Sequence, residues 1–427
     1  MQVSMKTRRA ATVATLLTLT PLAACSFDVT NPGPVQEQFL NDPAARTAIV
    51  NGAGRDLSDA LNWIAYTGAA ASREVFPAGS TGSFGITVQQ QIGKLTVDES
   101  DAYWQRAQRA RFEAESGAER FKTVLGADAY AKSKDVAQIL LWAGYANRLL
   151  GENMCDAVID GGAKQDYTTY LKRAEQELTD ANTIATAAGD TKTATAAIAA
   201  RASVRADLGN WTGAATDAGT IPDSYVYAMP YYTTDADQYN RIYWATANSP
   251  YRAHTVWNTY YAKYFTDTND PRVAYVQDPK NPVGDGAVLQ LGKVAWYSET
   301  KFNKKDAPIN LSTGWEMRLI EAEAKLVGGD VPGALSSLNK HRVALSLQPW
   351  TAATAADAWT ALKRERGIEL WLEGRRLGDL RRWKAANRPG ELSAFEVPGS
   401  TSYLDAAQTV CFPIPLSETQ TNPNLKG

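Results

Sequence analysis

The chain has 427 residues, of which 44 are basic and 46 acidic, so its formal net charge is −2. This balance gives no electrostatic reason to bind nucleic acid. Hydrophobic residues make up 44 % of the sequence, which is typical of a globular protein with a substantial core. The chain has only two histidines, His254 and His341, with no clustered cysteines, so we expect no metal site.

The N-terminus has the pattern of an exported lipoprotein. Basic residues in Lys6–Arg9 precede the apolar stretch Ala10–Leu22, which is too short to span a membrane. Cys25 follows Leu-Ala-Ala, as in a bacterial lipobox. We therefore expect a signal peptide over residues 1–24, lipidation of Cys25 and a tether over residues 25–34. An ordinary signal peptide with an incidental cysteine is the alternative.

Apolar residues recur at helical spacing along most of the remaining chain. Two intervals interrupt this pattern, the glycine-rich Arg73–Val97 and an irregular stretch rich in Tyr, Pro and Asp at about 221–308. The pattern predicts a mainly α-helical protein, with residues 35–427 as one domain that contains a loop-rich insert. The expected helices are Val35–Asn62, Asp98–Lys122, Asp128–Leu150, Tyr167–Ala187, Thr191–Leu208, Thr313–Val327, Val331–Leu345 and Ala355–Lys384.

A weak internal repeat relates Ala202–Ala215 to Ala322–Leu335. Each copy has a helix of small residues, then glycine, then Asn210 or Asp330, then Gly-Ala at the start of a second helix. The glycine suits a left-handed helix end, and the Asn or Asp suits the following turn. This pattern indicates tetratricopeptide-like helix pairs. Two copies are too few for a stable solenoid, so the pairs must pack against the irregular part of the chain.

The segment Glu365–Trp383 is densely charged. On one continuous helix, Glu365, Glu369 and Glu373 would share a face, and opposite charges would pair at a spacing of three residues. We expect an ion-pair network that ties this helix to the rest of the domain. A pair of glycosidase-type carboxylates is the alternative.

The segment Cys411–Glu418 has proline on both sides of Ile414 and should be extended. We expect it to be a strap that buries Phe412 and Ile414 in the core. An exported compartment would permit a disulfide between Cys155 and Cys411, and two buried free thiols remain the other possibility.

These C-terminal motifs resemble those of the SusD/RagB family of nutrient-uptake lipoproteins. Glu365–Trp383 is similar to the long family signature, and Cys411–Leu425 to the family's C-terminal ending. Asp270–Arg272 and Met317–Ala324 match shorter motifs. The resemblance implies a SusD-like fold without a cofactor. It also implies a non-catalytic protein, lipid-anchored at the outer-membrane surface, that captures an oligosaccharide or other nutrient for a TonB-dependent, SusC-like transporter.

The resemblance further implies that ligands bind where two variable regions meet. One of them, Tyr225–Tyr297, holds 16 of the 41 aromatic residues of the chain. Tyr and Trp offer flat faces to sugar rings, and nearby Asn and Arg can bind hydroxyl groups. The same residues could instead fill the core. The candidate ligand contacts are Tyr239, Asn240, Arg241, Tyr243, Trp244, Tyr251, Arg252 and His254, with Phe84 from the loop Arg73–Val97.

Two other classes of function compete with nutrient binding. A lipid-anchored helical-repeat scaffold would bind peptides or envelope proteins on its helix pairs. An exported hydrolase would need a nucleophile elbow, a zinc-binding histidine pair or a phosphate loop, and the sequence has none of these motifs. We therefore expect a binding protein and not an enzyme.

Overall fold

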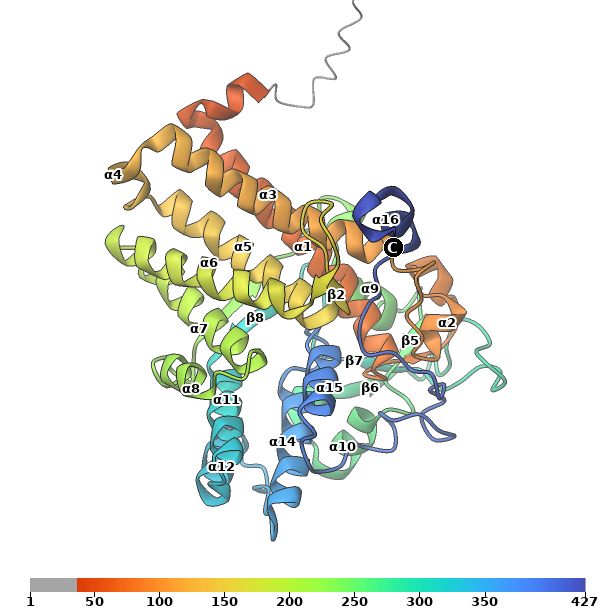
Figure 1. Cartoon of the computed structure of the whole chain (residues 1–427). Helices are drawn as coiled ribbons and strands as arrows, with labels where there is room; N and C mark the ends of the chain where they lie inside the picture. Colours follow the sequence, from red (N-terminus) through yellow and green to blue (C-terminus); the bar gives the residue numbers. More distant parts are fainter. Residues whose placement is uncertain (1–36, 427) are drawn as a thin grey trace, which may run out of the picture.

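Paired α-helices form the framework of the computed structural model, which describes residues 37–426 (Figure 1). From α5 to α8 each helix packs against the next along the chain, while α1 packs against α3 and α5. The longer helices are α1 (Arg46–Ala71), α3 (Asp101–Leu125), α5 (Lys134–Asn153), α6 (Thr168–Ala187), α7 (Thr191–Asp207), α11 (Gly314–Val327), α14 (Ala355–Glu369) and α15 (Arg376–Ala385).

Short helices connect and extend this framework. Their bounds are α2 (Val88–Gln91), α4 (Ala127–Tyr130), α8 (Trp211–Gly219), α9 (Arg241–Thr246), α10 (Tyr260–Thr268), α12 (Val331–Leu338), α13 (Lys340–Ala344) and α16 (Leu416–Thr421). Within residues 37–426, none of the helices combines the length and the apolar character needed to cross a membrane. The mainly helical fold expected from the sequence is confirmed.

Close helix packing depends on small residues at the contact points. A Cβ atom at Gly144 of α5 would lie 2.5 Å from Cγ of Leu178 on α6, and one at Gly151 would lie 2.5 Å from Cδ2 of Leu171. Real Cβ contacts are not so short, because interiors are already packed to crystal density. The two glycines therefore allow α5 and α6 to make the most extensive helix–helix contact in the described part of the chain.

The internal repeat forms two helix pairs, α7–α8 and α11–α12. Gly209 and Gly329 end the first helix of each pair with φ angles of 76° and 82°, the left-handed region that favours glycine. Asn210 then accepts a hydrogen bond from the backbone N–H of the residue three positions on, and Asp330 does the same. The pairs pack against each other through α8 and α11. The tetratricopeptide-like arrangement is confirmed.

Residues 37–426 form four small antiparallel sheets, of which three involve the irregular part of the chain and one lies in the connection between α5 and α6. The pair β4–β8 brings the two ends of the loop-rich segment together, because Met229 lies opposite Ile309 in its register. The sheets pair β1 (Phe76–Pro77) with β5 (His254–Thr255), β2 (Asp156–Ala157) with β3 (Gln165–Asp166), β4 (Val226–Met229) with β8 (Ile309–Thr313), and β6 (Tyr275–Gln277) with β7 (Tyr297–Glu299).

The main hydrophobic core joins the helices to the loop-rich segment. Tyr231, Ile242 and Tyr261 from that segment belong to the same buried cluster as the apolar faces of α1, α3 and α5. Trp104, expected in the core, is 3 % exposed and lies in this cluster. A separate buried cluster packs Ile221 and Tyr225 against α7, α8 and α11. The helix pairs are therefore packed against the irregular part of the chain, as a two-copy repeat requires.

Several predicted helix boundaries were wrong. The expected helix Val35–Asn62 begins at Arg46, after two short 3₁₀ turns, and continues to Ala71. The expected helix Asp128–Leu150 splits into α4 and α5, and Val331–Leu345 splits into α12 and α13. Helical periodicity therefore located the helices but did not detect the breaks within them.

The largest correction concerns Ala355–Lys384, which is not one helix. Helix α14 ends at Glu369 and α15 begins at Arg376. Between them Leu372 and Gly374 have φ angles of 63° and 75°, which no continuous α-helix allows. The three glutamates therefore do not share one helical face, because Glu373 lies in the connection.

The strap after Cys411 is extended up to Pro415, but residues 416–418, which we expected to be extended too, belong to α16 (Leu416–Thr421). Phe412 is fully buried and Ile414 is 7 % exposed, so both are in the core as expected. The backbone of Phe412 hydrogen-bonds to Asn153 and Cys155. A disulfide joins Cys155 to Cys411 and fixes the strap to the end of α5.

Candidate ligand-binding surface

Helix α9 carries several of the candidate residues, and α1 holds its first turn in place. The side-chain amide of Asn62 donates to the carbonyl of Tyr239 at 2.8 Å, and its oxygen accepts from the backbone N–H of Arg241 at 2.8 Å. Asn240 caps the helix by accepting from the N–H of Tyr243. The side chains of α9 thus project from a rigid base.

Three aromatic side chains lie in a row at the surface beside α9. The ring centroids of Tyr239 and Trp244 are 4.7 Å apart, and those of Trp244 and Tyr251 are 5.4 Å apart. Tyr251 is 43 % exposed, and the other two are partly exposed. We call Tyr239, Trp244 and Tyr251 the aromatic row. The ring of Phe84 packs edge-to-face against Tyr251, with 5.7 Å between the ring centroids.

Cationic side chains accompany the aromatic row. The ammonium of Lys305 lies 4.6 Å from the ring centroid of Tyr239 and 5.0 Å from that of Trp244. Arg241 stacks on Trp63 at 3.4 Å and donates to the carbonyl of Phe84 at 2.6 Å. Burial lowers the pKa of the Arg241 guanidinium. Flat faces and hydrogen-bond donors therefore stand side by side on one surface.

The structure brings together some predicted residues and separates others. Arg252 donates to the carbonyls of Ser249 and Val283 and so braces the loop that carries Tyr251. Tyr243 is partly buried and packs against the main core. Both remain partly exposed, so a direct contact with a ligand stays a prediction for each.

Burial corrects three predicted ligand contacts: Phe84, which is 4 % exposed and packs against Tyr251, and the two residues Asn240 and His254. Asn240 is fully buried, and its amide donates to the carbonyl of Ala307 at 2.9 Å. His254 is also fully buried, and the hydroxyl of Tyr66 lies 2.9 Å from its Nδ1. Burial, followed by the charge of Arg73, lowers the pKa of His254 to about 3. All three residues therefore have structural roles and cannot contact a ligand at the surface.

Sequence reasoning did not identify Lys305 or Trp63. Lys305 lies beyond the aromatic-rich interval, and Trp63 comes directly after the predicted helix Val35–Asn62. The only signal was the resemblance, which implied that two variable regions meet. Contact between Phe84 and Tyr251 does join the loop Arg73–Val97 to the aromatic-rich segment.

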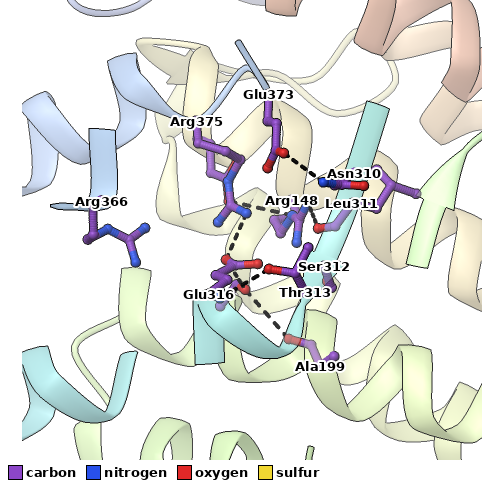
Figure 2. A network of polar contacts seen from close by, with 12 residues as sticks. Arg148, Ala199, Asn310, Leu311, Ser312, Thr313, Glu316, Arg366, Glu373 and Arg375 are labelled. Carbon is purple, nitrogen blue, oxygen red and sulfur yellow. Dashed lines mark hydrogen bonds and ion pairs between the residues drawn. The ribbon is translucent and has the colours of Figure 1, made fainter. Parts of the chain in front are cut away.

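The charges of the C-terminal signature form a buried network, not a catalytic pair. Figure 2 shows Arg375 directed at Glu316 of α11, with a distance of 2.8 Å between Nη1 and Oε1. Arg375 also pairs with Glu152 of α5. Burial alone would raise the pKa of Glu316, but Arg375 and the neighbouring Arg148 hold it below its usual value. The expected ion-pair network is confirmed.

Two separate sequence motifs meet in this network. Arg272, from the Asp270–Arg272 motif, contacts Glu365 at 2.5 Å and Glu369 at 2.8 Å. Glu373 instead pairs with Lys301 at 2.8 Å. Arg366–Glu369, Glu373–Arg376 and Asp379–Arg382 were the expected pairs at a spacing of three residues, and among the described residues only the last forms. Arg366 pairs with Asp379 instead, and Arg376 pairs with Glu396.

Comparison with solved structures found the same fold in proteins of low sequence identity. A SusD superfamily protein of Bacteroides vulgatus is 17 % identical and has a TM-score of 0.65, with 89 % of this chain and 97 % of that chain covered. A SusD-like carbohydrate-binding protein of the same species is 18 % identical, with a TM-score of 0.64 and coverages of 90 % and 97 %. A third, a SusD-like carbohydrate-binding protein of Bacteroides fragilis, is 14 % identical, with a TM-score of 0.60 and coverages of 91 % and 100 %.

Comparison with curated proteins found no significant match. The model of the SusD family, in contrast, matches residues 184–427, more than half of the chain. This match includes the α14–α15 signature, the Asp270–Arg272 motif and the strap, whose charges and apolar side chains form the contacts described above. The chain therefore belongs to the SusD family.

Proposed function

We propose that the protein binds an oligosaccharide on the aromatic row and delivers it to a TonB-dependent, SusC-like transporter of the outer membrane. The observation that carries the proposal is the partly exposed line of Tyr239, Trp244 and Tyr251 beside the ammonium group of Lys305. Sugar rings have an apolar face and a rim of hydroxyl groups, which match aromatic faces and N–H donors respectively.

Family membership supports this proposal at a coarser level. The SusD family consists of non-catalytic binding proteins, so the protein is not an enzyme. Two of its structural relatives are carbohydrate-binding proteins by description. Oligosaccharide binding by this chain, and delivery to a transporter, extend that family role.

A glycan array followed by calorimetry tests the ligand directly. We expect Trp244→Ala and Tyr251→Ala to weaken binding of the best glycan by about 0.5–1.5 kcal/mol each, because each removes one stacking face. Tyr232→Ala is the matched control, since Tyr232 is 53 % exposed and lies outside the aromatic row. All three variants should melt like the wild type. Binding equal to wild type in both row variants would reject the site.

Anchoring at the membrane is part of the same proposal. Residues 1–24 and Cys25 lie outside the described residues, so the expectation rests on the sequence pattern and on family membership. We expect a palmitate analogue to label the wild type and not Cys25→Ala, since the thiol is the acceptor of the first lipid. Equal labelling of both proteins would contradict lipidation at Cys25.

One observation favours the second candidate function, a helical-repeat scaffold for peptides. A groove of about 660 Å³ lies between α8, α11 and α12 and is lined by Trp211, Lys325 and Lys340, among others. A pulldown of envelope proteins with wild type and Lys340→Glu would test it. Partners lost only in Lys340→Glu would favour the scaffold, and glycan binding alone would favour the aromatic row.

A further inference from the structure

A cavity distinct from the groove beside α8 lies between α14, α15 and the segment 387–410 that leads to the strap. Its volume is about 530 Å³, which is within the usual range of small-molecule sites. Leu380 and Trp383 of α15 form one apolar wall, and Val397 and Val410 form part of the other. None of the residues that line it belongs to the aromatic row.

A buried ammonium group faces this cavity. Lys363 is 5 % exposed, and its Nζ donates to the carbonyls of Arg388 at 3.1 Å and Gly390 at 2.8 Å. An ammonium has three protons, so two neutral acceptors leave one for a ligand. Among residues 37–426, no carboxylate lies within ion-pair distance of Lys363. A buried cation without a counter-charge favours the arrival of an anion.

Two more cations stand at the rim. Lys384 is exposed, and the guanidinium of Arg388 lies 5.3 Å from the ring centroid of Trp359. Neither forms an ion pair within the described part of the chain. The carboxylate in the lining, Glu396, is already held by Arg376 at 2.6 Å. The cavity therefore combines an excess of positive charge with an apolar wall.

We propose that this cavity binds an organic carboxylate that carries an apolar group, either a free acid or the C-terminus of a peptide. The carboxylate would accept charge-assisted hydrogen bonds from Lys363 and the rim, and the apolar group would cover Leu380 and Trp383. A neutral glycan would leave the cationic groups without counter-charges. The site is thus distinct in chemistry and position from the aromatic row.

Calorimetry with matched pairs of probes tests the proposal. The free acids are octanoate and phenylacetate, and the peptide is acetyl-Leu-Phe with a free C-terminus. Each has an amide counterpart of the same shape and no charge. We expect at least one carboxylate to bind saturably and its amide to bind about tenfold more weakly or worse, as for a lost charge-assisted contact. Whether the acids or the peptide bind identifies the source of the carboxylate.

Charge reversal locates the site. Lys384→Glu combined with Arg388→Glu should weaken carboxylate binding by about tenfold or more. Lys384→Ala, a milder change at an exposed position, should weaken it in the same direction. Lys132→Glu is the control, because Lys132 is exposed on a loop far from the cavity lining.

Three results would overturn the proposal. They are no saturable binding of any of the three carboxylates, equal binding of acid and amide, and wild-type affinity in both cavity variants. Glycan binding on the aromatic row should be unchanged in the cavity variants, so that the two sites are tested separately.

Discussion

At the scale of single residues, burial decides which polar side chains can reach a ligand. Asn240 and His254 lie within the aromatic-rich segment, as do Trp244 and Tyr251. A short stretch of sequence contains both buried and exposed side chains, since neighbouring residues of a turn point inward and outward. Only the long-range contacts, from His254 to Tyr66 and from Asn240 to Ala307, distinguish them.

The buried histidine has a testable effect on stability. His254 has a pKa of about 3 in the folded protein, against an ordinary value of 6.5. As pH falls below 6.5 the unfolded chain binds a proton at this residue and the folded chain does not. The free energy of unfolding should therefore decrease by about 1.4 kcal/mol per pH unit between 6.5 and 3, and be unaffected by this residue above 6.5.

Urea unfolding of wild type and His254→Gln at several pH values would check this. All other titrating groups are common to both proteins, so their contributions cancel in the difference between the two free energies of unfolding. Glutamine does not titrate, so the difference reports the protonation of His254. We expect the free energy of unfolding of the wild type to decrease steadily, relative to that of His254→Gln, as the pH falls from 6.5. Parallel curves would mean that His254 does not titrate on unfolding.

At the scale of elements, the sequence located helices better than it located their ends. The periodic pattern continues through 370–375 and outweighed Gly374, the residue in this stretch that favours a left-handed turn. The break is held by tertiary contacts, since the backbone N–H of Leu372 donates to the buried carboxylate of Glu74. Gly374 then passes so close to α1 that a Cβ atom would lie 3.2 Å from Cα of Ala65.

The charged signature should stabilise the fold and leave ligand binding unchanged. Arg376 pairs with Glu396, and the two side chains are 3 % and 0 % exposed. Arg376→Ala would leave a buried carboxylate without its partner, at a typical cost of about 3–5 kcal/mol in the free energy of unfolding. Thermal melting measures this effect.

The exposed Lys384→Ala is the control for Arg376→Ala and should melt like the wild type. Glycan affinity per folded Arg376→Ala molecule should equal that of the wild type. A variant that melts normally but no longer binds the glycan would contradict the structural role of Arg376.

At the scale of the whole molecule, the sequence predicted the family, the helix pairs and the strap. Each has a signal within a short window: a long motif, a Gly-Asn or Gly-Asp turn, or prolines around a buried Ile414. The surroundings of the aromatic row have no such window, because Phe84 and Lys305 come from parts of the chain distant from Tyr239, Trp244 and Tyr251. The candidate site was therefore predicted only as a region, with Phe84, Asn240 and His254 wrongly placed at its surface.

The disulfide connects residues 256 positions apart. In the chain-entropy model, a constraint of that length stabilises the folded state by about 5–6 kcal/mol. Mass spectrometry of the exported protein without reduction should find the peptides of Cys155 and Cys411 linked. Two freely alkylatable thiols would reject the bond. Cys155→Ser should lower the melting temperature, and a Ser substitution at an exposed alanine such as Ala131 should not.

The ring closed by Cys155 and Cys411 also has a consequence for proteolysis. It encloses the exposed stretch Tyr232–Asp237, together with every helix from α6 to α15. A protease that cut this stretch once would produce two chains that stay covalently joined through the disulfide. The loop-rich segment contains the cut, and β4 and β8 pair its two ends, so a nicked molecule should keep its shape. A single cut in this exposed stretch would then not release the protein's halves.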